Sequence, residues 1–519
     1  MPDSTGFTVT DAKRRMLVDE ADLPRTARDV ATLLAASGQF FERGGCPVSI
    51  VADAQTGALI ARPATRETVV RAVHEQVQPY VVRNNRRGEP EEQPITLLDR
   101  LAAIYLDMAG QWNLPPLQGI AYAPLLGEGG AVQTHAGYHP PTGFWCASVP
   151  DLTGFLPAVP SMRDAKAALL KLRKVFATFP FADAPRRPGP GGIDLVDLRA
   201  PPGMDESGLL AGLLTAICRP SLFVAPGLLI RAPNLSGSGT GKGLLAKIIC
   251  TIAFGASPAA FTGGGNIKEL EARLGAALME ASPSIFLDNF NGGTLQSDLM
   301  ASVLTERLAK VRVLGLSKQV PLNPSCFLVV TGNAVMLSED LVRRFLVVEL
   351  DARTEDPEAR PFTGDLLADV KARRAELLGA ALTIWRWAQL NSGRIARGLA
   401  LGGYQQWCGW VRDALTALGA ADPVARVATI KAADTKRQDA AAFFEAWHER
   451  HGDRPIKAAE LDAEVRSIID PHGRGRQFIA SELAKLNGTR VAGLMLSRSK
   501  PSGRWSTASY AVMRPLPLE

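Results

Sequence analysis

The sequence feature that most constrains the fold is a glycine-rich loop between an apolar strand pattern and an amphipathic helix pattern. The loop comprises Ser236, Gly237, Ser238, Gly239, Thr240, Gly241, Lys242 and Gly243. Residues 227–231 before it read as a buried strand. In residues 242–252 after it, Leu and Ile recur on one helical face until Gly255 ends the pattern. Glycines allow successive backbone N–H groups to turn inward at a helix N-terminus, where they bind phosphate groups. We therefore expect a phosphate-binding loop here.

This loop departs from the usual phosphate-loop pattern at two positions. Ser236 replaces the first glycine, and Gly243 replaces the serine or threonine whose hydroxyl holds Mg²⁺. Lys242 is retained and would reach the β and γ oxygens of a nucleoside triphosphate. A Gly/Ser-rich turn before a helix can also be an ordinary loop that binds no phosphate, so the assignment depends on the residues that follow.

Polar residues follow two further apolar strand patterns. The run 285–287 ends in Asp288, which comes 46 residues after Lys242 (288 − 242 = 46). A carboxylate at this place holds Mg²⁺, directly or through water. Asn289 follows it and can orient a water molecule, although an amide cannot take the proton of that water.

The second of these patterns ends in Asn333, whose amide can reach a γ-phosphate or the attacking water. Arg343 and Arg344 come shortly after it. We expect these residues and the loop to bind ATP and Mg²⁺. For the two arginines, the alternative is a surface pair beside Glu349 or Asp351.

Buried strand patterns that alternate with helical patterns after residue 200 indicate the α/β class with a largely parallel sheet. The region before residue 180 mixes short strands and helices, and residues 184–192 are rich in Pro and Gly, as in a linker. We expect an N-terminal α+β domain (1–183), a Pro/Gly linker (184–203), a P-loop ATPase core (204–355), a helical lid-like region (356–434) and a winged-helix-like domain (435–519).

Individual elements can be predicted within these parts. Asn266 caps a helix, residues 311–314 and 320–322 read as a hairpin, and residues 365–390 read as one long amphipathic helix. The last part predicts three helices and then two strands, at 440–450, 458–469, 476–486, 490–497 and 505–513. That order suits a winged helix-turn-helix with 476–486 as the recognition helix and 498–504 as the wing. A plain helical oligomerisation module is the alternative.

Positive charge is concentrated at the C-terminal end. The formal net charge is +6, and residues 471–519 hold eight basic and two acidic side chains, a difference of +6 (8 − 2), so the rest of the chain is balanced. Lys and Arg neutralise DNA phosphates, so we expect this segment to bind DNA, with a solvated basic face as the alternative. The expected contacts are Arg476, Lys485, Arg498, Lys500 and Arg504.

The order of phosphate loop, strand ending in Asp, basic hairpin, strand ending in Asn and arginine resembles the superfamily 3 helicases of small viruses and plasmids. It is also similar to the AAA+ helicases of the minichromosome-maintenance type that prophages and mobile islands encode. Residues 311–315, 331–333 and 338–344 carry the likeness most clearly, and the resemblance covers residues 200–352. Ala334 departs from it, because many relatives have Asn there.

This resemblance implies a P-loop AAA+ core that forms a ring, usually a hexamer, whose arginine finger enters the neighbouring subunit's site. Lys242 would then be the phosphate lysine, Asp288 the magnesium ligand and Asn333 the sensor. Arg343 or Arg344 would be the finger. The hairpin would enter the central channel, where Lys318 contacts a DNA phosphate, with a solvated turn lysine as the alternative.

Two functions from different classes agree with these residues. The first is a ring-forming, ATP-dependent DNA helicase that acts in the replication of a phage, plasmid or other mobile element. The second is a nucleotide-gated DNA-binding initiator or regulator with little or no hydrolysis, because Gly243 and Asn289 lack groups that hydrolysis ordinarily uses. The sequence has no membrane-spanning run, no leader pattern and only scattered cysteines, so we expect a cytoplasmic protein with reduced thiols.

Overall fold

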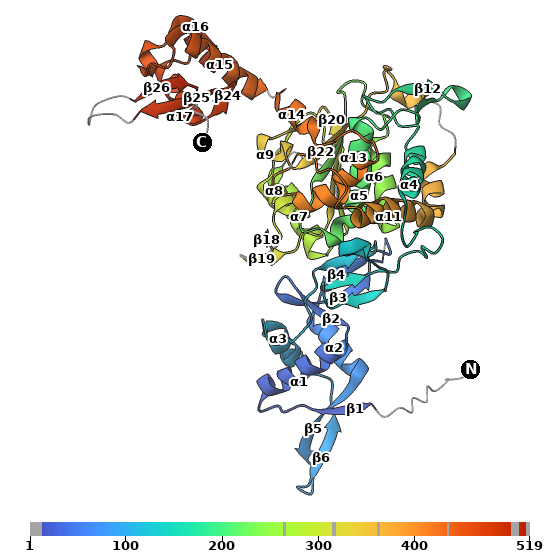
Figure 1. Ribbon diagram of the computed structural model, residues 1–519. Coiled ribbons are helices and arrows are strands. Elements are labelled where there is room, and N and C mark those ends of the chain that lie inside the picture. Colours follow the sequence, from blue (N-terminus) through green and yellow to red (C-terminus); the bar gives the residue numbers. More distant parts are fainter. Residues whose placement is uncertain are drawn as a thin grey trace. The chain divides into compact units, whose positions relative to one another are not determined.

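A parallel five-stranded sheet forms the centre of the larger part of the chain (Figure 1). Its strands, in spatial order, are β15 (Ala260–Thr262), β16 (Ser284–Asp288), β20 (Phe327–Asn333), β14 (Gly227–Ala232) and β22 (Phe345–Glu349). The last four are nearly continuous runs of buried apolar residues, as expected for strands covered on both faces. Because β20 lies between β14 and β16, the carboxyl ends of these three strands are adjacent. The parallel α/β layer predicted from the sequence is confirmed.

The computed structural model describes residues 13–54, 56–262, 266–313, 318–360, 364–399, 401–432, 435–499 and 508–514. The chain divides into two units, Met1–Val424 and Ala425–Glu519, and the central sheet belongs to the first. Each unit is described by itself below.

Two helices pack directly on the central sheet and are themselves covered by a second layer. The inner pair is α5 (Met204–Cys218) and α6 (Lys242–Phe254). The outer layer contains α4 (Met162–Val175), α10 (Leu366–Ala372) and α11 (Arg374–Leu390). Residues 205–218 of α5 are all buried, so this helix is enclosed on every side. Its buried Glu206 receives two hydrogen bonds from Arg173 of α4, at 2.7 and 2.9 Å.

The expected single helix at 365–390 is wrong in one respect, since the chain breaks between α10 and α11. Arg373 has φ −96° and ψ 16° there. The next side chain, Arg374, turns to the end of α6 and donates hydrogen bonds to the carbonyls of Ile252 and Ala253, at 3.2 and 3.1 Å. A cation at this place satisfies terminal carbonyls and complements the helix dipole. Gly255 ends α6 with φ 85°, as predicted.

A helix pair and a hairpin form the next part of the first unit. They are α7 (Ile267–Met279), α8 (Asp298–Thr305), β18 (Ala309–Arg312) and β19 (Gln319–Leu322). Asn266 caps α7 by accepting a hydrogen bond from the Lys268 backbone N–H at 2.9 Å, as predicted. The hairpin is confirmed as an antiparallel pair, and its tip, residues 314–317, lies outside the described residues.

The N-terminal region mixes short helices and small sheets. Its helices are α1 (Leu23–Ala36), α2 (Arg66–Gln76) and α3 (Asp99–Asp107). Its three-stranded sheets are β1 (Arg14–Leu17), β5 (Val77–Asn84) and β6 (Pro90–Pro94); β2 (Phe40–Arg43), β3 (Cys46–Ala52) and β4 (Leu59–Pro63); and β10 (Gly137–His139), β11 (Phe144–Cys146) and β7 (Gly119–Ala121). Buried Arg43 at the end of β2 donates hydrogen bonds to the last carbonyls of α7, those of Leu278 and Met279. This contact fastens the N-terminal region to α7.

The Pro/Gly-rich segment expected to be a linker is instead an antiparallel hairpin. Its strands are β12 (Arg186–Pro188) and β13 (Asp194–Val196). Arg186 donates hydrogen bonds to the carbonyls of Phe181 and Asp351, and the Val196 N–H donates to the Ala177 carbonyl at 2.8 Å. The Pro and Gly residues therefore make a turn within the first unit rather than an open connection.

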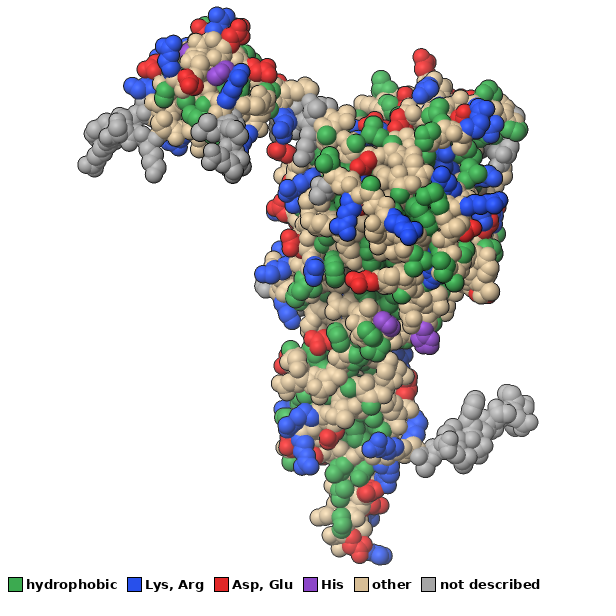
Figure 2. Space-filling view, viewed as in Figure 1, with side chains coloured by type: hydrophobic (Ala, Val, Ile, Leu, Met, Phe, Trp, Pro, Cys, Tyr) green, Lys and Arg blue, Asp and Glu red, His purple; other side chains and the backbone are tan. Residues whose placement is uncertain are grey.

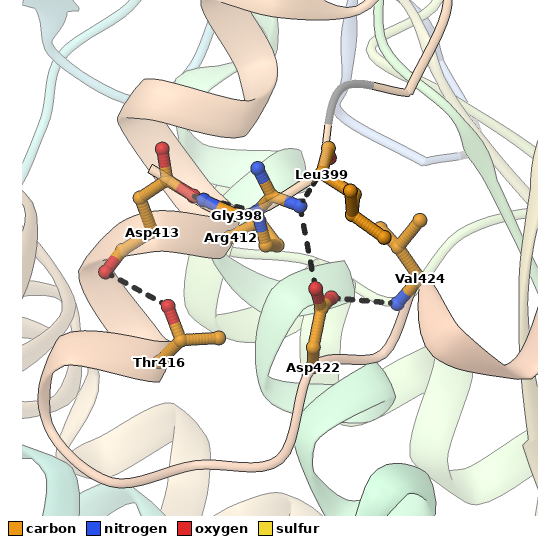
Figure 3. Close-up of polar contacts among 7 residues, drawn as sticks. All are labelled: Gly398, Leu399, Arg412, Asp413, Thr416, Asp422 and Val424. Carbon is orange, nitrogen blue, oxygen red and sulfur yellow. Dashed lines mark hydrogen bonds and ion pairs between the residues drawn. The ribbon is translucent and has the colours of Figure 1, made fainter. Parts of the chain in front are cut away.

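Short helical segments end the first unit and enclose a buried ion-pair cluster (Figure 3). They are α12 (Gln405–Trp407), the π-helical turn Cys408–Arg412 and α13 (Asp413–Ala417). Arg412 is 1% exposed and donates hydrogen bonds to Asp413 at 2.6 Å, to the Leu399 carbonyl at 2.7 Å and to Asp422 at 3.3 Å. Asp422 in turn accepts a hydrogen bond from the Val424 N–H, so the cluster fixes the chain where the first unit ends.

The described residues of the second unit form four helices and an antiparallel sheet. The helices are α14 (Ala425–Ala432), α15 (Thr435–His451), α16 (Ala463–Ile469) and α17 (Arg476–Leu486), of which α14 leads into the unit. The strands, in spatial order, are β23 (Ile456–Lys457), β26 (Ser509–Met513), β25 (Leu494–Ser499) and β24 (Arg490–Val491). Side chains from both layers, among them Phe444, Trp447 and Leu496, form its core.

Two expected elements of this unit are divided in the structure. The helix expected at 458–469 is a 3-10 turn followed by α16, because Asp462 interrupts it and caps α16 through a hydrogen bond from the Glu464 N–H at 2.9 Å. The strand expected at 490–497 turns back at Ala492 and Gly493, whose φ values are 51° and 72°. The helices expected at 440–450 and 476–486 are present.

Two general properties of the chain also follow from the structure. Among the described residues, no helix is both long and apolar enough to cross a membrane. All six cysteines are free thiols, and five of them are buried.

Candidate functional site

The glycine-rich loop lies at the carboxyl ends of β14, β16 and β20. Gly241 is the N-cap of α6 and has φ 95°, a left-handed conformation that favours glycine. Gly237 approaches β20 so closely that a Cβ on it would lie 2.5 Å from Asn333 Oδ1. These two glycines let the loop turn into α6 while it touches the end of β20.

Lys242, the first residue of α6, points back into this loop. Its Nζ donates a hydrogen bond to the Gly237 carbonyl at 2.5 Å and lies 3.3 Å from Thr240 Oγ1. Burial lowers the pKa of Lys242, and the nearby Asp288 carboxylate opposes this shift. The ammonium group is therefore enclosed by the loop and close to the end of β16.

Asp288 ends β16 and is held by two hydrogen bonds. Its Oδ1 accepts one from the hydroxyl of Thr331 on β20 and one from the Asn289 backbone N–H at 3.1 Å. Asn289 has φ 57°, a region that asparagine tolerates better than most residues, and its side chain is exposed. The described residues contain no cluster of three or more His, Cys, Asp or Glu side chains that would bind a metal by themselves.

Gly243 stands directly beside Asp288. A Cβ on Gly243 would lie 3.6 Å from Asp288 Oδ1, which is ordinary van der Waals contact. A serine or threonine side chain at position 243 would therefore lie next to this carboxylate. Gly243 itself supplies no side-chain hydroxyl there.

Asn333 ends β20 with a buried amide oxygen. Within the described residues, its Oδ1 has no hydrogen-bond partner. Its backbone groups are engaged, since its N–H donates to Asn291 Oδ1 at 2.8 Å and its carbonyl accepts from the Gly292 N–H at 3.0 Å. An unpartnered polar atom beside the loop is an available acceptor for a water molecule or a ligand.

Arg343 and Arg344 lie at the other end of the sheet, where β14 and β22 begin. They precede β22, whose first residue, Phe345, pairs with Gly227 at the start of β14. The loop follows the end of β14, which at about 3.3 Å per residue lies about 16 Å away. Both arginines form ion pairs with Asp340, and Arg344 is the less exposed of the two. The ion pairs described for the two arginines are thus with Asp340, whereas Glu349 pairs with Arg231.

Lys318 follows the hairpin tip and is exposed. Its Nζ would lie 3.4 Å from a Cβ on Gly45, so the ammonium group rests against the turn between β2 and β3. Burial raises the pKa of the neighbouring Cys46 thiol, and Lys318 opposes that shift. The base of the hairpin is packed, since Val311 and Val320 are buried.

The expected DNA contacts of the second unit are partly described. Arg476 at the start of α17 and Arg498 on β25 are exposed. Lys485 is exposed too and forms an ion pair with Glu482 at 2.6 Å. Lys500 and Arg504 lie outside the described residues. Figure 2 shows basic and acidic side chains interspersed over the visible face, without one large area of a single sign.

Sequence reasoning missed two residues that contact the loop. Ser238 Oγ donates a hydrogen bond to Glu358 Oε1 at 2.6 Å, and Arg360 Nη2 lies 3.4 Å from the Thr240 carbonyl. Both residues follow β22, another strand of the same sheet. The available signal was the position of charged residues soon after the carboxyl end of a parallel strand, where ligands of such sheets bind.

Comparisons with known proteins were made for the whole chain. No family model matches it, and no curated protein matches it. Among solved structures, the A form apo structure of the NrS-1 C-terminal region is 14% identical with a TM-score of 0.36, over 94% of this chain and 98% of that chain. A structure of JCV helicase with a bound acetamide compound is 13% identical with a TM-score of 0.20, over 43% of this chain and 66% of that chain. Because both TM-scores are below 0.5, we infer the function of this chain from its own residues.

Proposed function

We propose that this chain is an ATP-dependent DNA helicase that acts in the replication of a phage, plasmid or other mobile element. The observation that supports this most strongly is that Lys242, Asp288 and Asn333 meet where three adjacent parallel strands end. An enclosed lysine, a carboxylate and an unpartnered amide are groups that position and stabilise phosphoryl transfer. The parallel sheet with covering helices supports a P-loop core of the AAA+ type.

The residues at this edge fit ATP and Mg²⁺. The backbone N–H groups at the start of α6 and Lys242 would bind the phosphates. Asp288 would hold Mg²⁺, which proteins commonly bind through one or two carboxylates together with substrate phosphates. When bound, Mg²⁺ neutralises charge on the phosphate oxygens. Asn333 and Asn289 would orient the attacking water without accepting its proton.

A head-to-tail assembly is supported by the position of the arginines. Arg343 and Arg344 lie about 16 Å from the loop of their own chain, at the other end of the sheet. They would therefore act on the site of a neighbouring copy, where a guanidinium stabilises transition-state charge. Such contacts are heterologous, and they generate a ring when the rotation between successive copies closes. We propose a hexamer, the size that the sequence resemblance implies.

Contact with DNA is assigned to the second unit and the hairpin. The helices and antiparallel strands of the second unit support a winged helix, in which α17 would be the recognition helix. Arg476, Lys485 and Arg498 would contact phosphates there, and Lys318 would contact the strand in the ring's channel.

A second candidate function is a nucleotide-gated DNA-binding initiator or regulator that hydrolyses little ATP. The observation that favours it is the pair Gly243 and Asn289. Gly243 supplies no side-chain hydroxyl at the start of α6, and Asn289 supplies no base.

Steady-state ATP hydrolysis and strand displacement from a forked duplex separate the two candidates. The full-length chain is compared with Lys242→Ala and with Lys247→Ala, which changes an exposed lysine of the same helix. DNA-stimulated hydrolysis and strand displacement that Lys242→Ala abolishes and Lys247→Ala retains would support the helicase. Bound ATP without turnover above the Lys242→Ala background would favour the regulator.

A further inference from the structure

A short segment after β22 lies directly on the phosphate loop. We call residues 356–360 the strap; its centre is a 3-10 turn, Pro357–Ala359. The Glu358 carboxylate accepts a hydrogen bond from Ser238 Oγ at 2.6 Å. A Cβ on Gly239 would lie only 2.3 Å from Glu358 Cγ and 2.9 Å from the Glu358 backbone N. Only glycine at position 239 therefore permits the strap to pack against the loop in this way.

Arg360, at the end of the strap, contacts the same loop. Its Nη2 lies 3.5 Å from the Gly239 carbonyl and 3.4 Å from the Thr240 carbonyl. These are long hydrogen bonds to neutral acceptors, which are weaker than bonds to an anion. Arg360 Nε also donates a hydrogen bond to the Pro357 carbonyl of the strap at 3.2 Å, and a phosphate group would replace the two longer Nη2 contacts favourably.

Both arginines and carboxylates lie beside the strap. Burial lowers the pKa of Arg360, and the charge of Arg186 lowers it further. Burial also lowers the pKa of Arg186, as does the charge of Arg353, while Asp194 and Asp351 oppose that shift. Arg186, Arg353 and Arg360 therefore lie near enough for their charges to interact, with Asp194 and Asp351 beside them. Glu358 is the carboxylate that occupies the loop in this arrangement.

We propose that the strap gates the phosphate loop: Glu358 competes with nucleotide phosphates, and Arg360 binds those phosphates once Glu358 has moved away. This inference rests on the proposed function, because it concerns access to the same nucleotide site. A carboxylate next to the loop repels an incoming triphosphate. Its departure frees the Ser238 hydroxyl and leaves Arg360 as a cation that belongs to the same chain as the loop, unlike Arg343 and Arg344.

The test measures the affinity of the full-length chain for a fluorescent ATP analogue, in the presence of Mg²⁺ and without turnover. Glu358→Gln keeps the size of the side chain and removes its charge. Glu355→Gln makes the same charge change at an exposed position nearby and serves as the control. We expect Glu358→Gln to bind the analogue about tenfold more tightly and Glu355→Gln to bind within twofold of wild type.

A second pair of variants tests the role of Arg360. Arg360→Ala should weaken binding of the analogue by about tenfold or more, and Arg360→Lys should recover part of the loss because it restores a positive charge. Equal affinities of Glu358→Gln and Glu355→Gln, or wild-type affinity of Arg360→Ala, would overturn the gate. If Lys242→Ala still abolishes binding in that case, the proposed function stands. If the wild-type chain binds no nucleotide at all, both proposals fail.

Discussion

The hydroxyl of Thr331 donates a hydrogen bond to Oδ1 of Asp288 and so joins the end of β16 to β20. Thr331 is 0% exposed, whereas Asp288 is half-buried. The bond fixes the direction of a carboxylate that would otherwise rotate freely at a strand end. The orientation of the proposed magnesium ligand therefore depends on a neighbouring strand.

Replacing Thr331 by valine tests this dependence. We expect Thr331→Val to weaken the Mg²⁺ dependence of nucleotide binding several-fold and to destabilise the protein by about 1–2 kcal/mol, the usual effect of losing a buried hydrogen bond. Titration of Mg²⁺ at fixed nucleotide and thermal unfolding measure the two effects. Thr331→Ser, which keeps the hydroxyl, should bind Mg²⁺ like the wild type; equal behaviour of both variants would contradict the role of the hydroxyl.

Restoring the missing hydroxyl at position 243 should increase turnover. Gly243 lies within α6, and a Cβ there meets only Asp288, at 3.6 Å, so serine fits without strain. We expect Gly243→Ser to raise the rate of ATP hydrolysis by about tenfold at limiting Mg²⁺, because the hydroxyl adds an oxygen ligand for the metal. Gly243→Ala serves as the control. A rate increase of the same size in both variants would show that helix propensity, not the hydroxyl, is responsible.

The pH dependence of nucleotide binding should report the lowered pKa of Lys242. Binding needs the charged ammonium, so affinity is retained below the pKa of Lys242 in the free protein and falls as the pH rises through it. Because burial lowers this pKa, the decline should begin at a lower pH than the ordinary lysine value of 10.5 implies. Fluorescent nucleotide titrations between pH 7 and 10 measure it, and Lys242→Arg should move the decline to higher pH. An affinity that is flat over this range in the wild type would refute the assignment.

Mixing two inactive variants tests whether Arg344 acts on a neighbouring copy. Lys242→Ala removes the loop lysine and Arg344→Ala removes the finger, so each homogeneous assembly should be inactive. A mixed assembly contains some interfaces with an intact loop and an intact arginine, and should recover part of the ATP hydrolysis. Mixing Arg344→Ala with the double variant Lys242→Ala/Arg344→Ala provides the control, because none of those interfaces is complete. No recovery in the first mixture would place the arginine's role elsewhere.

Charge reversal in the second unit tests its contact with DNA. We expect Arg476→Glu and Arg498→Glu each to weaken DNA binding and to reduce the slope of log K against log salt by about one. Arg454→Glu, at an exposed position outside the basic segment, is the matched control. Affinity measured between 50 and 300 mM salt should separate the variants, and an equal loss in all three would indicate only a non-specific effect of charge.

Local patterns predicted the strands and the helix at the centre of the proposed nucleotide site. The strand, loop and helix at residues 227–254 follow from periodicity and from the glycines at each end. The ends of β16 and β20 follow from where their apolar runs stop at Asp288 and Asn333. These features depend on residues close together in the chain, so the sequence alone specifies them.

Contacts between distant residues were not predictable in the same way. The hydrogen bond from Ser238 to Glu358 joins residues 120 positions apart. The break at Arg373 is invisible in the apolar pattern, because its cause is the bond from Arg374 to the end of α6. The Pro and Gly content of residues 184–192 suggested a linker, but only packing decides whether such a segment is an open connection or, as here, a hairpin.

Arg43 determines where this chain can be divided. The residue lies on β2, and its guanidinium donates hydrogen bonds to carbonyls at the end of α7. One of these carbonyls belongs to Met279, which is 236 positions further along the chain. From there the chain passes through Ala281 directly into β16 and Asp288. A shortened protein that begins after β2 would remove the Arg43 hydrogen bonds from these carbonyls and expose the apolar surface around Ala281. The N-terminal region therefore supports the proposed nucleotide site, and recombination that replaced this region would have to bring an equivalent cation.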